Sequence, residues 1–196
     1  MKKLIGLTGK TGAGKSTVSA YLKEKGAYII DGDVLAREIL SIDKALLPRL
    51  CDCFGWDILE GDGVTLNRKA LARKAFSTPE NTALLNSVMH PAINREMKKR
   101  VEKAFSEYDT VVVDAAAIIE SGFADDCDVL LVVHAPENVR KERIMKRDNL
   151  SEDDAMVRMN GQKSDDFYIA KATYVISNYH DHDYKKQVDS LAKELF

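Results

Sequence analysis

One short segment near the start of the chain restricts the fold most strongly. Residues 6–17 read GLTGKTGAGKST, and Gly9, four further residues, Gly14, Lys15 and Ser16 match the pattern G-x-x-x-x-G-K-[ST] in full. Glycines allow the positive φ angles that turn successive backbone N–H groups toward a phosphate group, and the lysine supplies a cation. The segment therefore predicts a phosphate-binding loop.

The residues on either side of this loop fit that interpretation. Leu4 to Thr8 is a short apolar run typical of a buried strand. The stretch from Ser16 to Lys25 carries apolar residues at helical spacing and ends at Gly26. Strand, loop and helix thus follow the order that a phosphate loop requires, which disfavours a chance match in a glycine-rich turn. The predicted nucleotide-binding residues are Gly9, Gly12, Ala13, Gly14, Lys15, Ser16 and Thr17.

Three polar residues have distinct expected roles around a bound nucleoside triphosphate. Lys15 is expected to reach the β- and γ-phosphates, and the Ser16 hydroxyl to bind Mg²⁺. A second candidate Mg²⁺ ligand is Asp114, because it ends the apolar run TVVVD in the form of a strand whose carboxylate assists metal binding. Apolar strands also end in Asp without a metal role, so both interpretations of Asp114 stay open.

Length and composition favour one domain that acts on small molecules. The chain has 196 residues, of which 45% are hydrophobic, enough for one α/β core with insertions. Its 29 Lys and Arg residues against 31 Asp and Glu give no basic surface for nucleic acid or membrane, and no obligate protein partner is indicated. Three cysteines without framework spacing fit reduced thiols and a cytoplasmic location.

Apolar, β-branched runs alternate with helical patterns along the chain. They predict five strands, at Leu4–Thr8, Ala27–Asp31, Thr110–Asp114, Val129–His134 and Thr173–Ser177. The stretch from Val34 to Glu107 is rich in helix formers and has no strand character, which indicates a helical insertion. Helix starts are expected at Asn67, Thr78-Pro79 and Ser151, and a helix over Glu137 to Asp148. We expect an α/β phosphate-loop NTPase fold, with a five-stranded parallel sheet flanked by helices.

Two carboxylates follow the second predicted strand, in the segment IIDGDVLAR. Ligands of open α/β sheets bind beyond the carboxyl ends of the strands, so Asp31 and Asp33 lie where an acceptor would be. Asp33 is our candidate for the catalytic base or positioning group of an acceptor hydroxyl. The alternative is that Asp33 caps a helix beginning at Val34, and both roles are compatible.

A cluster of basic residues follows the fourth predicted strand. Arg143 and Arg147 are four residues apart, which places them on one face of a helix. Arginines on a movable segment neutralise the charge that spreads over the γ-phosphate oxygens during transfer, so both are candidate catalytic residues. The alternative is a solvated basic helix face.

Taken together, these segments resemble the dephospho-coenzyme A kinase family, nearly from end to end. The resemblance extends to IIDGDVLAREIL, to LLNSVMHPAINREM around His90-Pro91, to RIMKRDNLSEDDAMVRMNGQ with Gln162, and to ATYVISN, which ends in Asn178. It implies that ATP donates its γ-phosphate to the ribose 3′-hydroxyl of dephospho-coenzyme A, with Asn178 at the nucleotide. It also implies roles for Asp33 as base, Lys15 and Ser16 at phosphate and Mg²⁺, and Arg143 and Arg147 in the lid.

The family's architecture implies three regions in this single kinase domain. They are a nucleotide core at about 1–33, 108–136 and 172–196, a helical acceptor-binding insertion at about 34–107, and a lid at about 137–171. The chain also departs from the family pattern. Ala116 or Ala117 stands where a proline is expected, and Lys10 and Thr11 replace a glycine and an apolar residue in the loop.

Two alternative functions remain at this point. A kinase of the same fold that acts on a nucleoside, a nucleotide or another small metabolite would need the same Asp33 and the same lid arginines. An NTP-hydrolysing switch is less favoured, because the guanine-reading Asn-Lys-x-Asp pattern is absent and the only nearby D-x-x-G, from Asp52 to Gly55, does not follow a predicted strand.

Overall fold

The protein is described by a computed structural model that covers residues 2–180 and 182–196. Its strands form one parallel sheet in the order β2-β3-β1-β4-β5. The strands are β1 (Lys3–Gly9), β2 (Tyr28–Asp31), β3 (Thr110–Asp114), β4 (Val129–His134) and β5 (Tyr174–Ser177). The five predicted strands and the parallel sheet are confirmed, with ends shifted by at most one residue.

The sheet is apolar on both of its faces. On one face, alternate residues such as Ile5 and Leu7 of β1 and Leu131 of β4 form a buried cluster. That cluster includes residues of α1 (Lys15–Glu24), α9 (Tyr184–Ser190) and α10 (Ala192–Leu195). The intervening residues, Leu130 and Val132 among them, are buried as well. Burial on both faces explains why these strands read as continuous apolar runs rather than as an alternating pattern.

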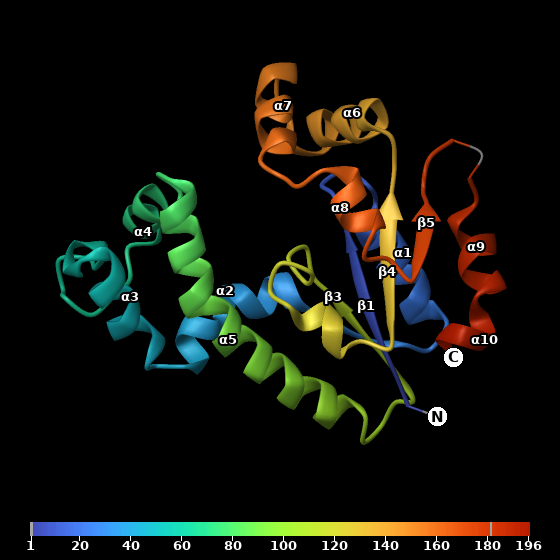
Figure 1. The fold of residues 1–196 in the computed structure, drawn as a ribbon, viewed down its shortest axis with the longest axis horizontal. Helices are drawn as coiled ribbons and strands as arrows, with labels where there is room; N and C mark the ends of the chain where they lie inside the picture. Colours follow the sequence, from blue (N-terminus) through green and yellow to red (C-terminus); the bar gives the residue numbers. More distant parts are fainter. Residues whose placement is uncertain (1, 181) are drawn as a thin grey trace. The chain divides into compact units, whose positions relative to one another are not determined.

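The remaining elements of the sheet-containing unit follow β3 and β4. They are the 3₁₀ helix η2 (Phe123–Asp126), then α6 (Glu137–Asp148), α7 (Glu152–Asn160) and α8 (Asp165–Ile169). Figure 1 shows α6 directly beyond the carboxyl end of β4. None of the described helices combines the length and the apolar character that a bilayer crossing needs.

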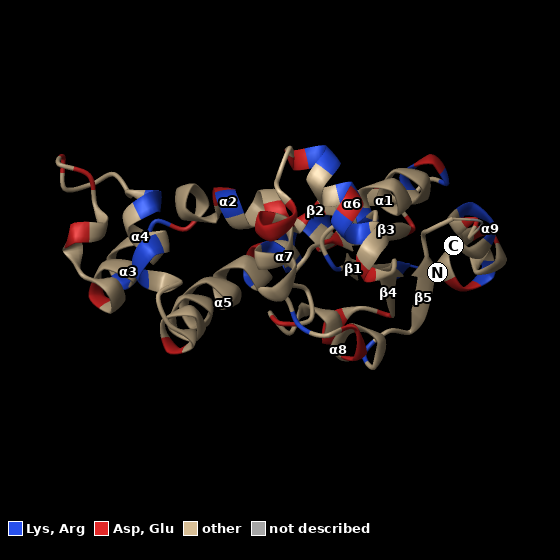
Figure 2. Cartoon of the chain, turned by 90° about the horizontal axis from the view of Figure 1, so that it is seen from above, with Lys and Arg blue, Asp and Glu red and all other residues tan. Residues whose placement is uncertain are grey.

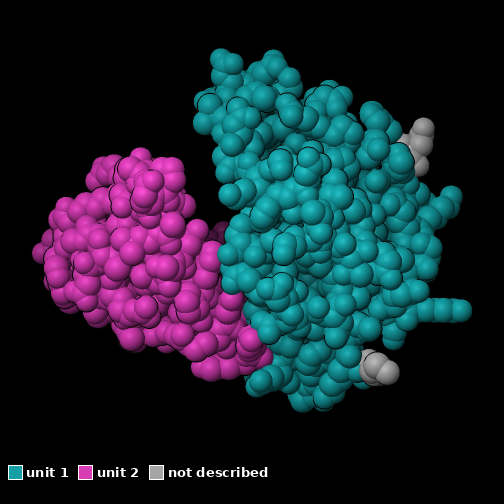
Figure 3. Space-filling model, in the orientation of Figure 1, with its two compact units in different colours: residues 1–33, 100–196 teal, residues 34–99 magenta. Residues whose placement is uncertain are grey.

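Residues 34–99 form a second compact unit, whereas residues 1–33 and 100–196 form the first (Figure 3). The second unit is built from α2 (Gly32–Ile42), α3 (Leu46–Phe54), η1 (Trp56–Ile58), α4 (Arg68–Ala75) and α5 (Pro79–Ala104), with the ends of α2 and α5 in the first unit. Leu46, Leu50 and Ile58 are fully buried. An isolated antiparallel bridge joins Leu59 and Leu66. The helical character predicted for this stretch is confirmed.

Side-chain caps confirm the predicted helix starts. The Asn67 carboxamide oxygen accepts the Ala70 N–H at 2.9 Å, and the Thr78 hydroxyl accepts the Asn81 N–H at 3.1 Å. The Ser151 hydroxyl accepts the Asp154 N–H at 3.1 Å. Each cap satisfies an N–H group that the first turn of a helix leaves without an intrahelical partner.

Asn67→Ala is expected to lower the free energy of unfolding by about 1 kcal/mol, because the Ala70 N–H loses its acceptor. Urea unfolding followed by circular dichroism measures this change. Asn67→Ser retains an acceptor oxygen and serves as the matched control. Equal losses in the two variants would show that the cap does not contribute.

Candidate active site

The phosphate loop joins β1 to α1 and requires glycine at two positions. Gly12 and Gly14 have φ angles of 80° and 91°. A Cβ atom on Gly12 would lie 2.6 Å from the backbone oxygen of Arg140, and one on Gly14 would lie 2.0 Å from the Asn178 side-chain nitrogen. The loop is therefore packed against the start of α6 and the end of β5, and a side chain at either position would displace it.

Three of the predicted residues meet at the first turn of α1. The Lys15 ammonium group forms an ion pair with the Asp114 carboxylate at the end of β3. It also lies 3.6 Å from Oδ2 of Asp33, in the first turn of α2. The Lys15 and Asp114 side chains are 19% and 13% exposed, whereas that of Asp33 is 49% exposed. One cation thus links two carboxylates, of which Asp33 is the more exposed.

The alternative role of Asp33 as a helix cap is not supported. Helix α2 begins at Gly32 rather than at Val34, so Asp33 lies within its first turn. Its Oδ1 atom accepts the backbone N–H of Ala116 at 3.1 Å. The side chain is directed instead to the segment that follows β3.

The two candidate arginines lie on α6 but have different partners. Nη1 of Arg143 donates to the backbone oxygens of Gly12 and Ala13, both at 3.3 Å. Nε and Nη2 of Arg147 donate to the Asp148 carboxylate at 2.8 and 2.7 Å. These hydrogen bonds hold the pKa of Asp148 below its ordinary value. Figure 2 shows the basic residues along α6. The structure therefore brings Arg143 to the phosphate loop, while Arg147 contacts Asp148.

Asn178 and Gln162 complete the contacts of the loop. The Asn178 side chain donates to the backbone oxygen of Ala13 at 3.1 Å, and the Gln162 side-chain oxygen accepts the Thr11 N–H at 2.9 Å. Residues distant in sequence thus fix the loop from two sides.

Comparison with known proteins identifies the family. The family model described as dephospho-CoA kinase matches residues 3–183. The chain belongs to the dephospho-CoA kinase family. The dephospho-CoA kinase of Corynebacterium diphtheriae is 38% identical over 99% of this chain and 96% of that protein. The dephospho-CoA kinase of Corynebacterium jeikeium is 44% identical over 81% of each chain.

Solved structures agree with the assignment of the fold. The protein TT1252 from Thermus thermophilus has a TM-score of 0.82 at 30% identity, and covers 100% of this chain and 98% of its own. A shikimate kinase from Acinetobacter baumannii has a TM-score of 0.57 at 17% identity, covering 99% of this chain and 94% of its own, and shares the fold alone. The predicted phosphate-loop fold is therefore confirmed.

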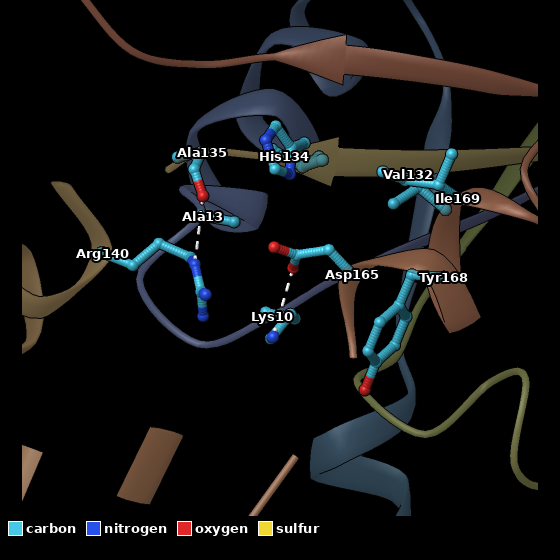
Figure 4. A pocket seen from close by; sticks show the side chains of 10 residues that line it. Lys10, Ala13, Val132, His134, Ala135, Arg140, Asp165, Tyr168 and Ile169 are labelled. Atoms are coloured by element: carbon cyan, nitrogen blue, oxygen red, sulfur yellow. Dashed lines mark hydrogen bonds and ion pairs between the residues drawn. The ribbon is translucent and has the colours of Figure 1, made fainter. Parts of the chain in front are cut away.

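In this member of the dephospho-CoA kinase family, a small pocket lies beside the loop (Figure 4). Lys10 forms an ion pair with Asp165 of α8 at 3.2 Å on its wall. Arg140 is only 2% exposed, although arginine is usually found at protein surfaces. Its Nε atom donates to the Ala135 backbone oxygen at 3.0 Å. Tyr168 donates from its hydroxyl to Glu120 at 3.1 Å. Burial raises the pKa of Tyr168, so it remains a hydrogen-bond donor.

These pocket contacts were not predicted from the sequence. The only signal was the extra charge of Lys10 within the loop, which requires a partner when it is partly buried. Nothing in the local pattern distinguishes Asp165 from the other acidic residues near the start of α8, and a buried Arg140 contradicts the expectation that charge runs on helices face water.

Proposed function

We propose that this chain transfers the γ-phosphoryl group of ATP to the ribose 3′-hydroxyl of dephospho-CoA, giving CoA and ADP. Membership in the dephospho-CoA kinase family supports the substrates. The observation that carries the proposal is the placement of the Asp33 carboxylate 3.6 Å from the Lys15 ammonium group. Asp33, the proposed proton acceptor, thus lies next to Lys15, the proposed phosphate-binding cation.

The donor is held by the loop. Backbone N–H groups of the loop and of the first turn of α1 bind the phosphates, and Lys15 contacts the β- and γ-phosphates. In the proposed complex, Lys15 exchanges its bond with Asp114 for bonds with the triphosphate. Arg143 is within reach of the same phosphates, because its guanidinium group contacts the loop backbone.

The chemistry of the oxygen donors fits Mg²⁺. Ser16 offers a hydroxyl and Asp114 a carboxylate, and Mg²⁺ bound with nucleotides takes one or two protein oxygens together with phosphate oxygens. Among the described residues, no group of three or more His, Cys, Asp and Glu side chains is arranged to hold a metal by itself. When bound, Mg²⁺ would neutralise charge on the phosphates.

Asp33 acts on the acceptor. Its carboxylate takes the proton of the ribose 3′-hydroxyl while that oxygen forms a bond to the γ-phosphorus atom, and the bond from this atom to the β,γ-bridging oxygen breaks to release ADP. Lys15 and Arg143 neutralise the charge that develops on the phosphate oxygens. Positioning and charge neutralisation supply most of the rate acceleration in such transfers.

The first test is ADP release from ATP and Mg²⁺ with dephospho-CoA, compared with adenosine, AMP and no acceptor. Turnover that requires dephospho-CoA is expected. Turnover with another acceptor alone would favour a different small-molecule kinase. Equal ADP release without any acceptor would favour the NTP-hydrolysing switch.

Arg143→Ala is expected to lower kcat by about 10²-fold, because one phosphate-neutralising group is lost from the transition state. Steady-state kinetics at saturating ATP and dephospho-CoA measure the loss. The matched variant is Arg147→Ala, one turn further along α6, for which a smaller loss is expected because Arg147 pairs with Asp148. A larger loss for Arg147→Ala would show that Arg147, and not Arg143, is the main phosphate-neutralising arginine.

A further inference from the structure

The backbone of Ala116 connects two parts of the proposed catalytic centre. Its N–H group donates to Oδ1 of Asp33 at 3.1 Å. Its carbonyl oxygen accepts the hydroxyl of Thr8 at 3.1 Å. The N–H group of the preceding residue, Ala115, donates to the backbone oxygen of Leu7 at 3.1 Å. The segment after β3 is therefore fixed to β1 by two hydrogen bonds and to Asp33 by a third.

Thr8 gives this arrangement its rigidity. It lies in β1 next to Gly9, where the phosphate loop begins, and the residue is 0% exposed. A buried hydroxyl that donates to a carbonyl oxygen holds that peptide in one orientation, because rotation would leave both groups without a partner. The direction of the Ala116 N–H is consequently defined relative to the phosphate loop.

Burial alone does not fix the Asp33 carboxylate, which is more exposed than that of Asp114. The Asp33 side chain is 49% exposed, and a carboxylate in the first turn of a helix has several rotamers open to it. A hydrogen bond from a backbone N–H to a charged carboxylate is among the stronger neutral-donor contacts in proteins. The Ala116 N–H binds Oδ1, which leaves Oδ2, the oxygen 3.6 Å from Lys15, to face the reacting groups.

We propose that the Ala116 N–H, oriented by Thr8, positions the Asp33 carboxylate so that Oδ2 receives the acceptor proton. The inference rests on the proposed function, in which Asp33 is the base. Ala116 and Thr8 are positioning residues, because they act through Asp33 and contact no reacting atom.

The most direct test of the Ala116 N–H follows from the chain's departure from the family pattern. A proline is expected at position 116 or 117, and a proline has no N–H to donate. Ala116→Pro therefore removes this donor from the chain. Ala116→Ser retains the N–H and is the matched control. For the second residue, Thr8→Val removes the hydroxyl with little change of shape, and Thr8→Ser retains it.

Ala116→Pro is expected to lower kcat for dephospho-CoA phosphorylation about tenfold, with KM for ATP and for dephospho-CoA changed by less than about twofold. Thr8→Val is expected to show a loss of kcat in the same direction. Both serine variants are expected to stay near the wild-type rate. Steady-state kinetics on the full chain, with melting temperatures recorded for every variant, provide these values.

A double-mutant cycle separates positioning from general disruption. In an Asp33→Ala background the carboxylate is gone, so Ala116→Pro is expected to cause no further loss of the residual rate. The same tenfold loss in that background, or a kcat of Ala116→Pro equal to wild type, would overturn the inference. A wild type without dephospho-CoA-dependent turnover would overturn the proposed function as well, so the two failures are distinguishable.

Discussion

Asp33→Asn is expected to lower kcat by about 10³-fold, the range typical of a lost general base. Asparagine has the shape of aspartate, and its side-chain oxygen still accepts the Ala116 N–H, but it takes no proton at neutral pH. The affinity for ATP is expected to change by less than about threefold, because in the proposed function the loop binds ATP whereas Asp33 acts on the acceptor.

Two measurements test this prediction on one preparation. Steady-state kinetics give kcat, and isothermal titration calorimetry with a non-hydrolysable ATP analogue gives the affinity. Asp31→Asn makes the same chemical change two residues earlier, at the end of β2, and a smaller loss is expected. A near-normal kcat for Asp33→Asn would remove Asp33 from the mechanism.

Lys15→Ala is expected to impair both binding and transfer, with kcat/KM for ATP lower by about 10³-fold, because a charge-assisted contact to the β- and γ-phosphates is lost. The substitution also leaves the Asp114 and Asp33 carboxylates without the cation that lies between them. The two carboxylates then repel each other and also repel the triphosphate, and both effects weaken ATP binding further.

Lys10→Ala is the control for Lys15→Ala, because Lys10 belongs to the same loop and carries the same charge. Its ammonium group pairs with Asp165 at 3.2 Å instead of facing Asp33 and Asp114. A loss of less than about tenfold in kcat/KM is expected for Lys10→Ala. Unchanged ATP affinity and rate for Lys15→Ala would contradict the assignment of the loop.

Much of the fold was predictable because its signals are local. The β1 run, the glycine pattern and the first turn of α1 lie within one short stretch, and the strands β1, β3 and β4 are continuous apolar runs buried on both faces. Caps such as Asn67 and Ser151 act on N–H groups three residues away, so their effect is also visible in the sequence. Local chemistry therefore specified the elements and their order.

The sequence was enough to propose the residue types of the candidate site, but it did not reveal their contacts. A spacing of four places Arg143 and Arg147 on one face of α6, yet only the folded chain shows that Arg143 reaches the loop. The Ala116 N–H and Asp33 are 83 residues apart, and because every residue except proline has a backbone N–H, the sequence does not mark which of them binds Asp33. Partners of this kind depend on tertiary structure.

The limit of the helical unit illustrates the same point. A change from insertion to core was expected near Glu107, whereas the compact unit ends at Lys99. Helix α5 continues from Pro79 to Ala104 without interruption. Because a continuous helix carries no turn signal at residue 99, the amino-acid pattern does not reveal where its contacts change.

The ion pair between Lys15 and Asp114 has a consequence for which anions the loop accepts. A carboxylate tethered in the same fold competes for the lysine at an effective concentration on the order of millimolar or more. Free anions that offer a single contact, such as chloride or acetate, meet this internal competitor at a disadvantage. A triphosphate overcomes it, because it binds the backbone N–H groups at the same time. The Asp114 carboxylate thus favours ligands that contact the loop at several points over ligands that make a single contact with Lys15.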